Sequence, residues 1–293
     1  MKIAIFGKKI KRDSFSHIQK LFDILNTQNI DTYFYEPFYK CLNKKASIKL
    51  YSKKTFKYHY DINKSFNFLI SIGGDGTILD AVTLIRNKNI PIIGINTGRL
   101  GFLSNISKTE IEDSITKILN NNYKIEERTL LKITSKSKIT NDFNFALNEI
   151  SFIKKDSGSM ISIDVYIDDI FANTYWADGL IISTPTGSTA YSLSVGGPIV
   201  IPNSKNIIIS PIAPHTLTVR PIVIQDSAKL KIKISGRNKN YLLTLDSRSI
   251  KITSSNEFYI TKANFTIKIV NISSDLYFSM LRNKLMWGVD KRN

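Results

Sequence analysis

The spacing of apolar residues divides the chain into an opening part, where strands alternate with helices, and a later part made of strands. Residues 2–6 form a short apolar run that predicts a strand. Residues 15–25 carry apolar side chains three and four positions apart, which predicts a helix. Residues 31–36 are aromatic and β-branched and predict a second strand. This β-α-β opening favours a parallel sheet.

Two further strands of the opening part are each followed by a turn that contains glycine. An apolar run over residues 66–72 precedes Gly73-Gly74-Asp75-Gly76-Thr77, and a run over residues 90–95 precedes residues 96–103. Helical spacing returns after each turn. Open parallel sheets bind ligands where turns follow strands, so residues 1–122 are predicted to form a Rossmann-like α/β domain with its ligand at these turns.

The rest of the chain follows other patterns. The lysine-rich residues 37–65 show no clear period, and we expect them to form a mobile surface segment. From residue 123 onward, runs such as 161–167 and 230–234 alternate apolar and polar positions, which is typical of half-buried strands. Residues 123–272 are therefore predicted to form an all-β, sandwich-like domain. Residues 273–293 are predicted to form a closing helix that packs back on the first domain.

The composition is that of a folded protein with a strongly basic surface. The 293 residues are 42% hydrophobic, enough for a sizeable core, and no run approaches the roughly 20 apolar residues that span a membrane. The net charge is +17, but lysine, isoleucine and asparagine are abundant throughout, which indicates a compositional bias more than a nucleic-acid surface. The single cysteine, Cys41, cannot form an internal disulfide and fits a reducing cytoplasm.

The turn Gly73–Thr77 has the chemistry of a phosphate-binding loop with one carboxylate at its centre. Its three glycines let the backbone approach a ligand, and the following helix directs unpaired N–H groups and its dipole toward an anion. Asp75 would repel a phosphate unless a metal bridges the two or Asp75 takes a proton from an attacking hydroxyl. Both arrangements point to phosphoryl transfer. The alternative is a plain strand-to-helix connection in which Asp75 or Thr77 caps the helix.

Three polar features of the strand-rich part are candidates for chemistry. The pair Asn148-Glu149 stands at the start of the apolar run 150–153, and Asp178-Gly179 precedes another strand. Each pair also fits an ordinary turn. The segment 184–198 is dense in hydroxyls and glycine directly after a strand, so it can bind phosphate or ribose, and its Tyr191 can stack on a base.

Together these motifs resemble those of the NAD kinase family. The turn Gly73–Thr77 alone is shared with diacylglycerol and sphingoid-base kinases, and a close relative of it occurs in 6-phosphofructokinases. The combination and order of the motifs are similar to NAD kinase over nearly the whole chain, and the hydroxyl-rich segment is the most specific of them. The motifs that carry the resemblance are Gly73–Thr77, Asn96–Leu103, Asn148-Glu149, Ala177–Leu180, Ser183–Ser192, Gly196–Pro198 and Ala213–Leu217.

The resemblance implies an ATP-dependent kinase that phosphorylates the 2′-hydroxyl of the adenosine ribose of NAD to give NADP. Asp75 would accept the proton of that hydroxyl as a general base. ATP would bring Mg²⁺ or another divalent metal, without direct protein ligands. The loop for the ATP phosphates would be Gly73, Gly74, Gly76 and Thr77. The dinucleotide would contact Asp75, Gly76, Asn148, Glu149, Asp178, Thr189, Ala190, Tyr191, Ser192, Leu193, Ser194 and Ala213.

The resemblance also implies a cytoplasmic homo-oligomer, commonly a tetramer, whose partners are NAD and ATP and neither nucleic acid nor membrane. Some members accept polyphosphate, so the donor stays open, as does the preference between NAD and NADH. Trp176 stands where many relatives carry a basic residue, and Arg248 stands where glutamine is frequent. Two alternatives remain at this point: a lipid or sphingoid-type kinase that shares the glycine-aspartate turn, and a basic nucleic-acid-binding protein.

Overall fold

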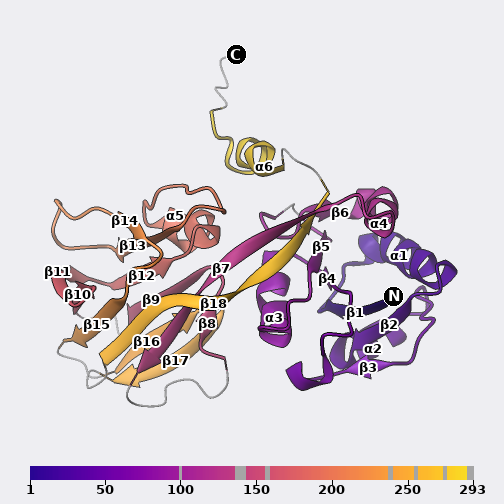
Figure 1. The fold of residues 1–293 in the computed structure, drawn as a ribbon, viewed down its shortest axis with the longest axis horizontal. Coiled ribbons are helices and arrows are strands. Elements are labelled where there is room, and N and C mark those ends of the chain that lie inside the picture. Colours follow the sequence, from indigo (N-terminus) through magenta and orange to yellow (C-terminus); the bar gives the residue numbers. More distant parts are fainter. Residues whose placement is uncertain are drawn as a thin grey trace. The chain divides into compact units, whose positions relative to one another are not determined.

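The chain folds into two compact units, which a computed structural model shows (Figure 1). The structure describes residues 1–98, 101–135, 143–155, 159–236, 240–253, 257–272 and 276–288. The first unit comprises Met1–Glu127 and Ile267–Asn293, and the second comprises Arg128–Thr266. The domain boundaries proposed from the sequence lie at residues 122 and 272. Arg99 and Leu100 of the second glycine-bearing turn, and residues 273–275 of the closing segment, lie outside the described residues.

The first unit is an α/β domain in which strands and helices alternate. Its elements are β1 (Lys2–Gly7), α1 (Phe15–Thr27), β2 (Asp31–Tyr35), α2 (Glu36–Asn43), β3 (Thr55–Phe56), β4 (Phe68–Ile72), α3 (Asp75–Ile85), β5 (Ile92–Asn96), β6 (Ile106–Ser107), α4 (Ile111–Leu119) and α6 (Leu276–Leu285), with 3-10 helices at Arg12–Ser14, His59–Asp61 and Lys108–Glu110. The strands β7 (Lys124–Ser135) and β18 (Glu257–Asn271) each contribute residues to both units.

The strand order of the first unit places its glycine turn where such sheets bind ligands. The order is β5-β4-β1-β2-β3, and all of these strands run parallel. β2 lies on one side of β1 and β4 on the other, so the strand order reverses at β1. Ligands of open α/β sheets bind beyond the carboxyl ends of the strands at such a point. Gly7 at the end of β1 is in register with Ile72 at the end of β4, so the turn at Gly73 begins there.

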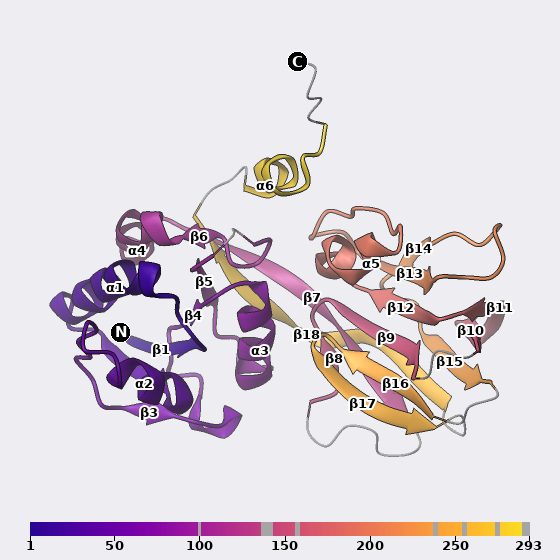
Figure 2. The same ribbon diagram turned by 180° about the vertical axis from the view of Figure 1, so that it is seen from behind.

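Helices cover this sheet because their apolar stripes match its buried strands. β4 and β5 are buried along their whole length, as parallel strands between helical layers are. α1 and α4 lie side by side, which both views show (Figures 1 and 2). The residues that these helices and α3 bury are Ile18, Leu21, Phe22, Leu25, Ile78, Ala81, Val82, Ile85, Ile111, Ser114, Ile115 and Ile118.

The segment 37–65 is built into the first unit, so the expectation of a mobile surface segment is wrong. It contains most of α2, all of β3 and a 3-10 helix. Phe38 and Leu42 lie one helical turn apart on α2, and both are buried. Ile48, Phe56 and Ile62 are buried as well. Phe38 and Leu42 have helical spacing, whereas Ile48, Phe56 and Ile62 are isolated apolar residues that give no periodic signal in the sequence.

The second unit consists of two sheets around one hydrophobic core. Its further elements are β8 (Phe145–Ala146), β9 (Glu149–Lys154), β10 (Ile161–Ile167), β11 (Ile170–Ala177), β12 (Gly179–Ser183), α5 (Tyr191–Ser194), β13 (Asn206–Ile212), β14 (Ile222–Gln225), β15 (Leu230–Ser235), β16 (Asn240–Leu245) and β17 (Arg248–Thr253), with a 3-10 helix at Thr186–Thr189. One sheet has the order β11-β10-β15-β18, with β7 beside β18 and β8 beside β7. The other is β14-β13-β12-β9-β16-β17 and is antiparallel.

A single cluster of buried residues draws on both sheets, for example Val165 and Ile232 from the first and Phe152 and Ile182 from the second. This is the packing of a β-sandwich. The predicted fold class, an α/β domain followed by an all-β domain, is therefore confirmed. None of the helices among the described residues is both long and apolar enough to cross a membrane.

The closing helix α6 belongs to the first unit, as predicted. Met280 and Leu281 are buried. The Tyr277 ring lies 6.2 Å from the Phe102 ring, measured between centroids. The helix therefore packs near Phe102, in the second glycine-bearing turn.

Candidate functional site

The turn after β4 has the backbone geometry that its first glycine was expected to supply. Gly73 has φ +153°, a value that residues with side chains rarely adopt, and a Cβ at this position would overlap the Thr77 hydroxyl. The Gly73 N–H donates to the carbonyl of Ile95 at 2.9 Å, which ties the turn to β5. This fixes the point at which α3 begins.

Gly74 and Gly76 leave open space beside the first turn of α3. A Cβ at either position would meet no described atom within 4 Å, so packing inside the protein does not require glycine there. The first N–H groups of a helix lack partners within it, and open space beside them suits a phosphate. The N-cap of α3 is Gly74, without a side-chain cap bond. The alternative in which Asp75 or Thr77 caps the helix is therefore wrong.

The Asp75 side chain is held by the main chain of a neighbouring loop. Its Oδ2 accepts the N–H of Phe102 at 2.8 Å, and its Oδ1 accepts those of Leu103 at 3.1 Å and Ser104 at 2.9 Å. The side chain is 28% exposed. A carboxylate oxygen has two lone pairs, so Oδ2 keeps one that no N–H occupies. The carboxylate is thus both oriented and able to take a proton.

The loop 101–104 fits Asp75 closely. A Cβ at Gly101 would overlap the Asp75 carboxylate, so glycine is needed for this approach. The hydroxyl of the buried Ser104 donates to the Gly73 carbonyl at 2.9 Å. Sequence reasoning missed this partnership. A signal existed, because β4 and β5 are neighbours in a parallel sheet and the turns that follow them meet at one edge.

A second missed residue is Lys284, in the last turn of α6. Its Nζ lies 3.7 Å from Asp75 Oδ2 and 4.7 Å from the centroid of the Phe102 ring. The Lys284 side chain is 40% exposed. The glycine turn itself contains no lysine, and α6 supplies a cation beside its carboxylate.

The residues of the second unit that were predicted to bind the dinucleotide lie beside one strand, β12, or at its ends. Asn148-Glu149 lies at its carboxyl end, where Glu149 is in register with Ser183. Asp178 directly precedes β12. Ala213 follows Ile212, and Ile212 is in register with Gly179, the first residue of β12. At about 3.3 Å per residue, these two ends are roughly 15 Å apart.

The segment between these ends, α5, lies over the middle of the strand. Ser192 Oγ is 3.2 Å from Ser210 Oγ, and Ser210 is in register with Ile181. Side chains alternate along a strand, so Ser210 points away from the core that holds Ile209. The segment α5 therefore lies on the outer face of this sheet.

Many of the hydroxyls near the start of the segment 184–198 bond within the protein. Thr184 Oγ1 donates to the Leu147 carbonyl at 2.6 Å, and Ser183 Oγ donates to the Asn148 carbonyl at 3.2 Å. Ser188 Oγ donates to the Val200 carbonyl at 3.2 Å. The hydroxyls of Ser183 and Thr184 fix the start of the loop to Leu147 and Asn148, and that of Ser188 ties it to Val200. The contacts predicted for Thr189, Ala190, Tyr191, Ser192, Leu193 and Ser194 with a dinucleotide stay predictions.

Asn148 and Glu149 are buried polar residues with unused hydrogen-bonding groups. They are 9% and 7% exposed. Within the described part of the chain, Asn148 Oδ1 and Glu149 Oε2 have no hydrogen-bond partner. Burial, together with the nearby charge of Asp246, raises the pKa of Glu149 to about 8, although the N–H of Tyr191 donates to its carboxyl group. Buried groups are normally paired, so this pair is prepared for a ligand.

Asp178 forms an ion pair with Lys154, whose Nζ lies 2.5 Å from Asp178 Oδ1. Main-chain bonds also fix its position, because its N–H donates to the Ile212 carbonyl at 2.9 Å. Trp176 is 59% exposed, and its ring lies 6.3 Å from that of His215. An exposed aromatic ring thus lies two residues before Asp178.

Comparison with known proteins decides between the alternatives that the turn left open. The model of the ATP-NAD kinase N-terminal domain matches residues 3–123, and that of the ATP-NAD kinase C-terminal domain matches residues 147–272. The chain belongs to the ATP-NAD kinase family. The curated NAD kinases of Flavobacterium psychrophilum and Cytophaga hutchinsonii are 48% and 44% identical to it, and each match covers both chains completely.

Solved structures agree with the fold. Yeast NADH kinase complexed with NADH superposes with a TM-score of 0.84 at 24% identity, covering 99% of this chain and 89% of that one. An NAD kinase from Archaeoglobus fulgidus in complex with ATP gives a TM-score of 0.76 at 24% identity, covering 98% and 99%. The prediction of an ATP-dependent NAD kinase is confirmed by the family, and neither a lipid kinase nor a nucleic-acid-binding protein is supported.

Proposed function

We propose that Asp75 accepts the proton of the 2′-hydroxyl of the adenosine ribose of NAD during phosphoryl transfer from ATP. The ribose oxygen forms a bond to the γ-phosphorus, the bond from that phosphorus to the β–γ bridging oxygen breaks, and ADP leaves. A ribose hydroxyl is a weak nucleophile near neutral pH, so a positioned base assists it. The observation that carries this proposal is the carboxylate of Asp75, oriented by three N–H groups with one lone pair left on Oδ2.

The ATP phosphates are proposed to lie at the start of α3, over Gly73, Gly74, Gly76 and Thr77. Support comes from the open space at Gly74 and Gly76 and from the N-terminal N–H groups of the helix. The described residues contain no cluster of three or more His, Cys, Asp or Glu that could hold a metal ion. Bound Mg²⁺, carried by the ATP phosphates, would neutralise their charge.

The dinucleotide is proposed to bind along the outer face of β12. Asn148 and Glu149 would pair with a ribose diol, which both donates and accepts hydrogen bonds. Asp178 and Ala213 mark the other end of the strand, and Tyr191 on α5 offers an exposed ring between them. Gly76 of the first unit and Thr189–Ser194 complete the predicted set of contacts.

The proposal extends to a cytoplasmic enzyme that assembles as a homo-oligomer, commonly a tetramer in relatives of this kind. The unpaired Cys41 is compatible with a reducing compartment. Light scattering coupled to gel filtration would measure the assembly directly, and a monomer at micromolar concentration would contradict a stable tetramer.

The activity can be tested with purified protein, ATP, Mg²⁺ and NAD, with an NADP-specific dehydrogenase to detect product. We expect NADP with NAD as acceptor and none with an NAD analogue that lacks the adenosine 2′-hydroxyl. Parallel reactions with NADH and with inorganic polyphosphate define the acceptor and donor preferences. Absence of NADP across metals and pH would contradict the proposal.

A further inference from the structure

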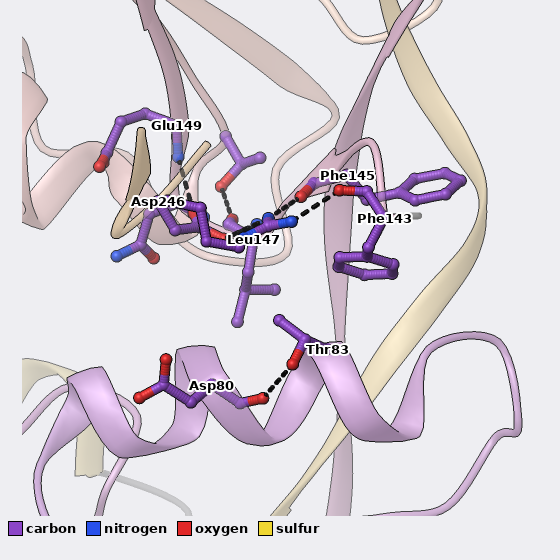
Figure 3. A network of polar contacts seen from close by, with 10 residues as sticks. Asp80, Thr83, Phe143, Phe145, Leu147, Glu149 and Asp246 are labelled. Carbon is purple, nitrogen blue, oxygen red and sulfur yellow. Dashed lines mark hydrogen bonds and ion pairs between the residues drawn. The ribbon is translucent and has the colours of Figure 1, made fainter. Parts of the chain in front are cut away.

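Asp246 is a buried carboxylate that binds the main chain of the Asn148-Glu149 pair. It lies in the turn between β16 and β17, and its side chain is 3% exposed. Its Oδ1 accepts the N–H groups of Asn148 at 2.7 Å and Glu149 at 3.3 Å, and its Oδ2 accepts that of Leu147 at 3.0 Å (Figure 3). The Asp246 N–H donates in turn to the Glu149 carbonyl at 3.0 Å.

Arg248, two residues further along, binds the segment just before the pair. Its NH1 donates to the Phe143 carbonyl at 2.6 Å, and its NH2 donates to the Phe145 carbonyl. The guanidinium also lies 5.0 Å from the centroid of the Phe143 ring, and its NH2 is 3.9 Å from Asp246 Oδ2. One turn therefore holds the chain from residue 143 to residue 149 at five main-chain positions.

Two of the residues that this turn holds have a side-chain atom without a hydrogen-bond partner. Asn148 Oδ1 and Glu149 Oε2 are buried and have no hydrogen-bond partner within the described residues. Their main chain is fixed, while one polar atom of each side chain can still bind a ligand. A fold needs no such pair of unsatisfied groups, because each costs free energy when buried.

We propose that Asp246 and Arg248 are positioning residues that hold Asn148 and Glu149 in the orientation required to bind the ribose of the dinucleotide. This rests on the proposed function, since it assumes that the pair binds NAD. Asp246 and Arg248 themselves do not touch the substrate in this account. Arg248, which departs from the common glutamine, gains two carbonyl contacts by its forked guanidinium.

The charges around the pair support a hydrogen-bond donor at Glu149. Two groups act on its carboxyl group, the Asp246 carboxylate and the N–H of Tyr191 from α5, and the Arg248 guanidinium lies beside the Asp246 carboxylate. Burial raises the pKa of both acids. Asp246 has three N–H donors and a nearby guanidinium that stabilise its charge, whereas Glu149 has one N–H donor, so protonation of Glu149 is favoured over protonation of Asp246. A neutral Glu149 donates to a ribose oxygen, whereas an ionised one cannot.

The test is steady-state kinetics of NAD phosphorylation with Asp246→Asn and Arg248→Met, using Asp226→Asn as a matched control. Asp226 is also a buried carboxylate of the second unit, but it pairs with Lys262 at 2.8 Å. Asparagine at position 246 has one acceptor oxygen in place of two. We expect the KM for NAD to rise by about tenfold, the effect of losing main-chain bonds to a charged group, with the KM for ATP nearly unchanged.

The pH dependence of the KM for NAD is a second measurement, and it would not change if Asp246 had a purely structural role. In the wild type, the KM for NAD should rise above pH about 8, as Glu149 loses its proton. In Asp246→Asn the rise should move to lower pH, because the neighbouring negative charge is gone. In Asp226→Asn both the KM and the profile should stay as in the wild type.

The outcomes separate this inference from the proposed function. A wild-type protein that makes no NADP would refute the function itself. An active wild type with an unchanged KM for NAD in Asp246→Asn would overturn the positioning role. If Asp246→Asn is not recovered folded, Arg248→Met decides, because methionine cannot donate to the carbonyls of Phe143 and Phe145. A raised KM for NAD supports the role, and an unchanged KM and profile overturn it.

Discussion

Lys284 Nζ lies 3.7 Å from Asp75 Oδ2, so the last helix of the chain places a cation beside the carboxylate of the glycine turn. Both residues belong to the first unit. The glycine turn has no lysine of its own to offset the charge of a triphosphate. Lys284 is half-exposed and lies against the Phe102 ring, a position from which its flexible side chain can reach either Asp75 or a phosphate.

Lys284→Met is expected to raise the KM for ATP by about three- to tenfold and to leave the KM for NAD almost unchanged. The magnitude is modest because a partly exposed charge is screened by solvent. Initial-rate kinetics over ATP concentration would measure it. Lys117→Met is the control, since Lys117 pairs with Asp113 on α4 and should show no effect. Equal ATP kinetics in Lys284→Met and the control would remove Lys284 from the site.

Gly101→Ala is expected to abolish most activity with little loss of thermal stability. The added Cβ would overlap the Asp75 carboxylate and displace it from the three N–H groups. We expect kcat to fall by about 10²-fold, as small misplacements of catalytic groups do. Gly98→Ala is the matched control, because its Cβ would meet Asn96 Oδ1 at an ordinary 3.8 Å. Comparable kcat in both variants would mean that the position of Asp75 is unimportant.

Asp178→Ala is expected to raise the KM for NAD far more than the KM for ATP. Asp178 stands at the end of β12 opposite Asn148-Glu149, and its carboxylate pairs with Lys154. Lys154→Met separates the two partners, because it removes the cation and leaves the carboxylate in place. If the KM for NAD rises only in Lys154→Met, the lysine and not Asp178 serves the substrate.

Glu149→Gln is expected to be more stable than the wild type, by a margin that grows with pH. The pKa of Glu149 is about 8 in the folded protein against an ordinary 4.5. Between these values the folded state retains a proton that the unfolded chain has released, so wild-type stability falls by about 1.4 kcal/mol per pH unit as pH rises. Denaturant unfolding at pH 5, 6.5 and 8 would measure the margin. A margin independent of pH would mean that Glu149 is ionised throughout.

Much of the fold follows from the sequence because its signals are local. The alternation over residues 161–167 coincides with β10, and the strand, glycine turn and helix around Gly73 appear where their pattern places them. The segment 37–65 could not be predicted in this way. Ile48, Phe56 and Ile62 are buried by tertiary contacts, and no local period in the sequence indicates their burial.

The supporting residues of the site could not be predicted for a similar reason. Asp75 meets the N–H groups of residues 27 to 29 positions away, and Asp246 meets the chain 97 to 99 positions away. Main-chain N–H groups are the same in almost every residue type. The sequence alone therefore does not indicate which of them bind the carboxylates of Asp75 and Asp246. Lys284 resembled an ordinary lysine in the last turn of a helix.

The central claim is that Asp75 takes the proton of the ribose hydroxyl. Asparagine at this position keeps one acceptor oxygen for the loop 102–104 but cannot serve as a base. The decisive measurement is kcat for Asp75→Asn, together with its dissociation constant for NAD by calorimetry. We predict a fall in kcat of about 10²-fold or more with nearly unchanged NAD affinity. A kcat close to that of the wild type would contradict it and leave Asp75 as an anchor for the loop.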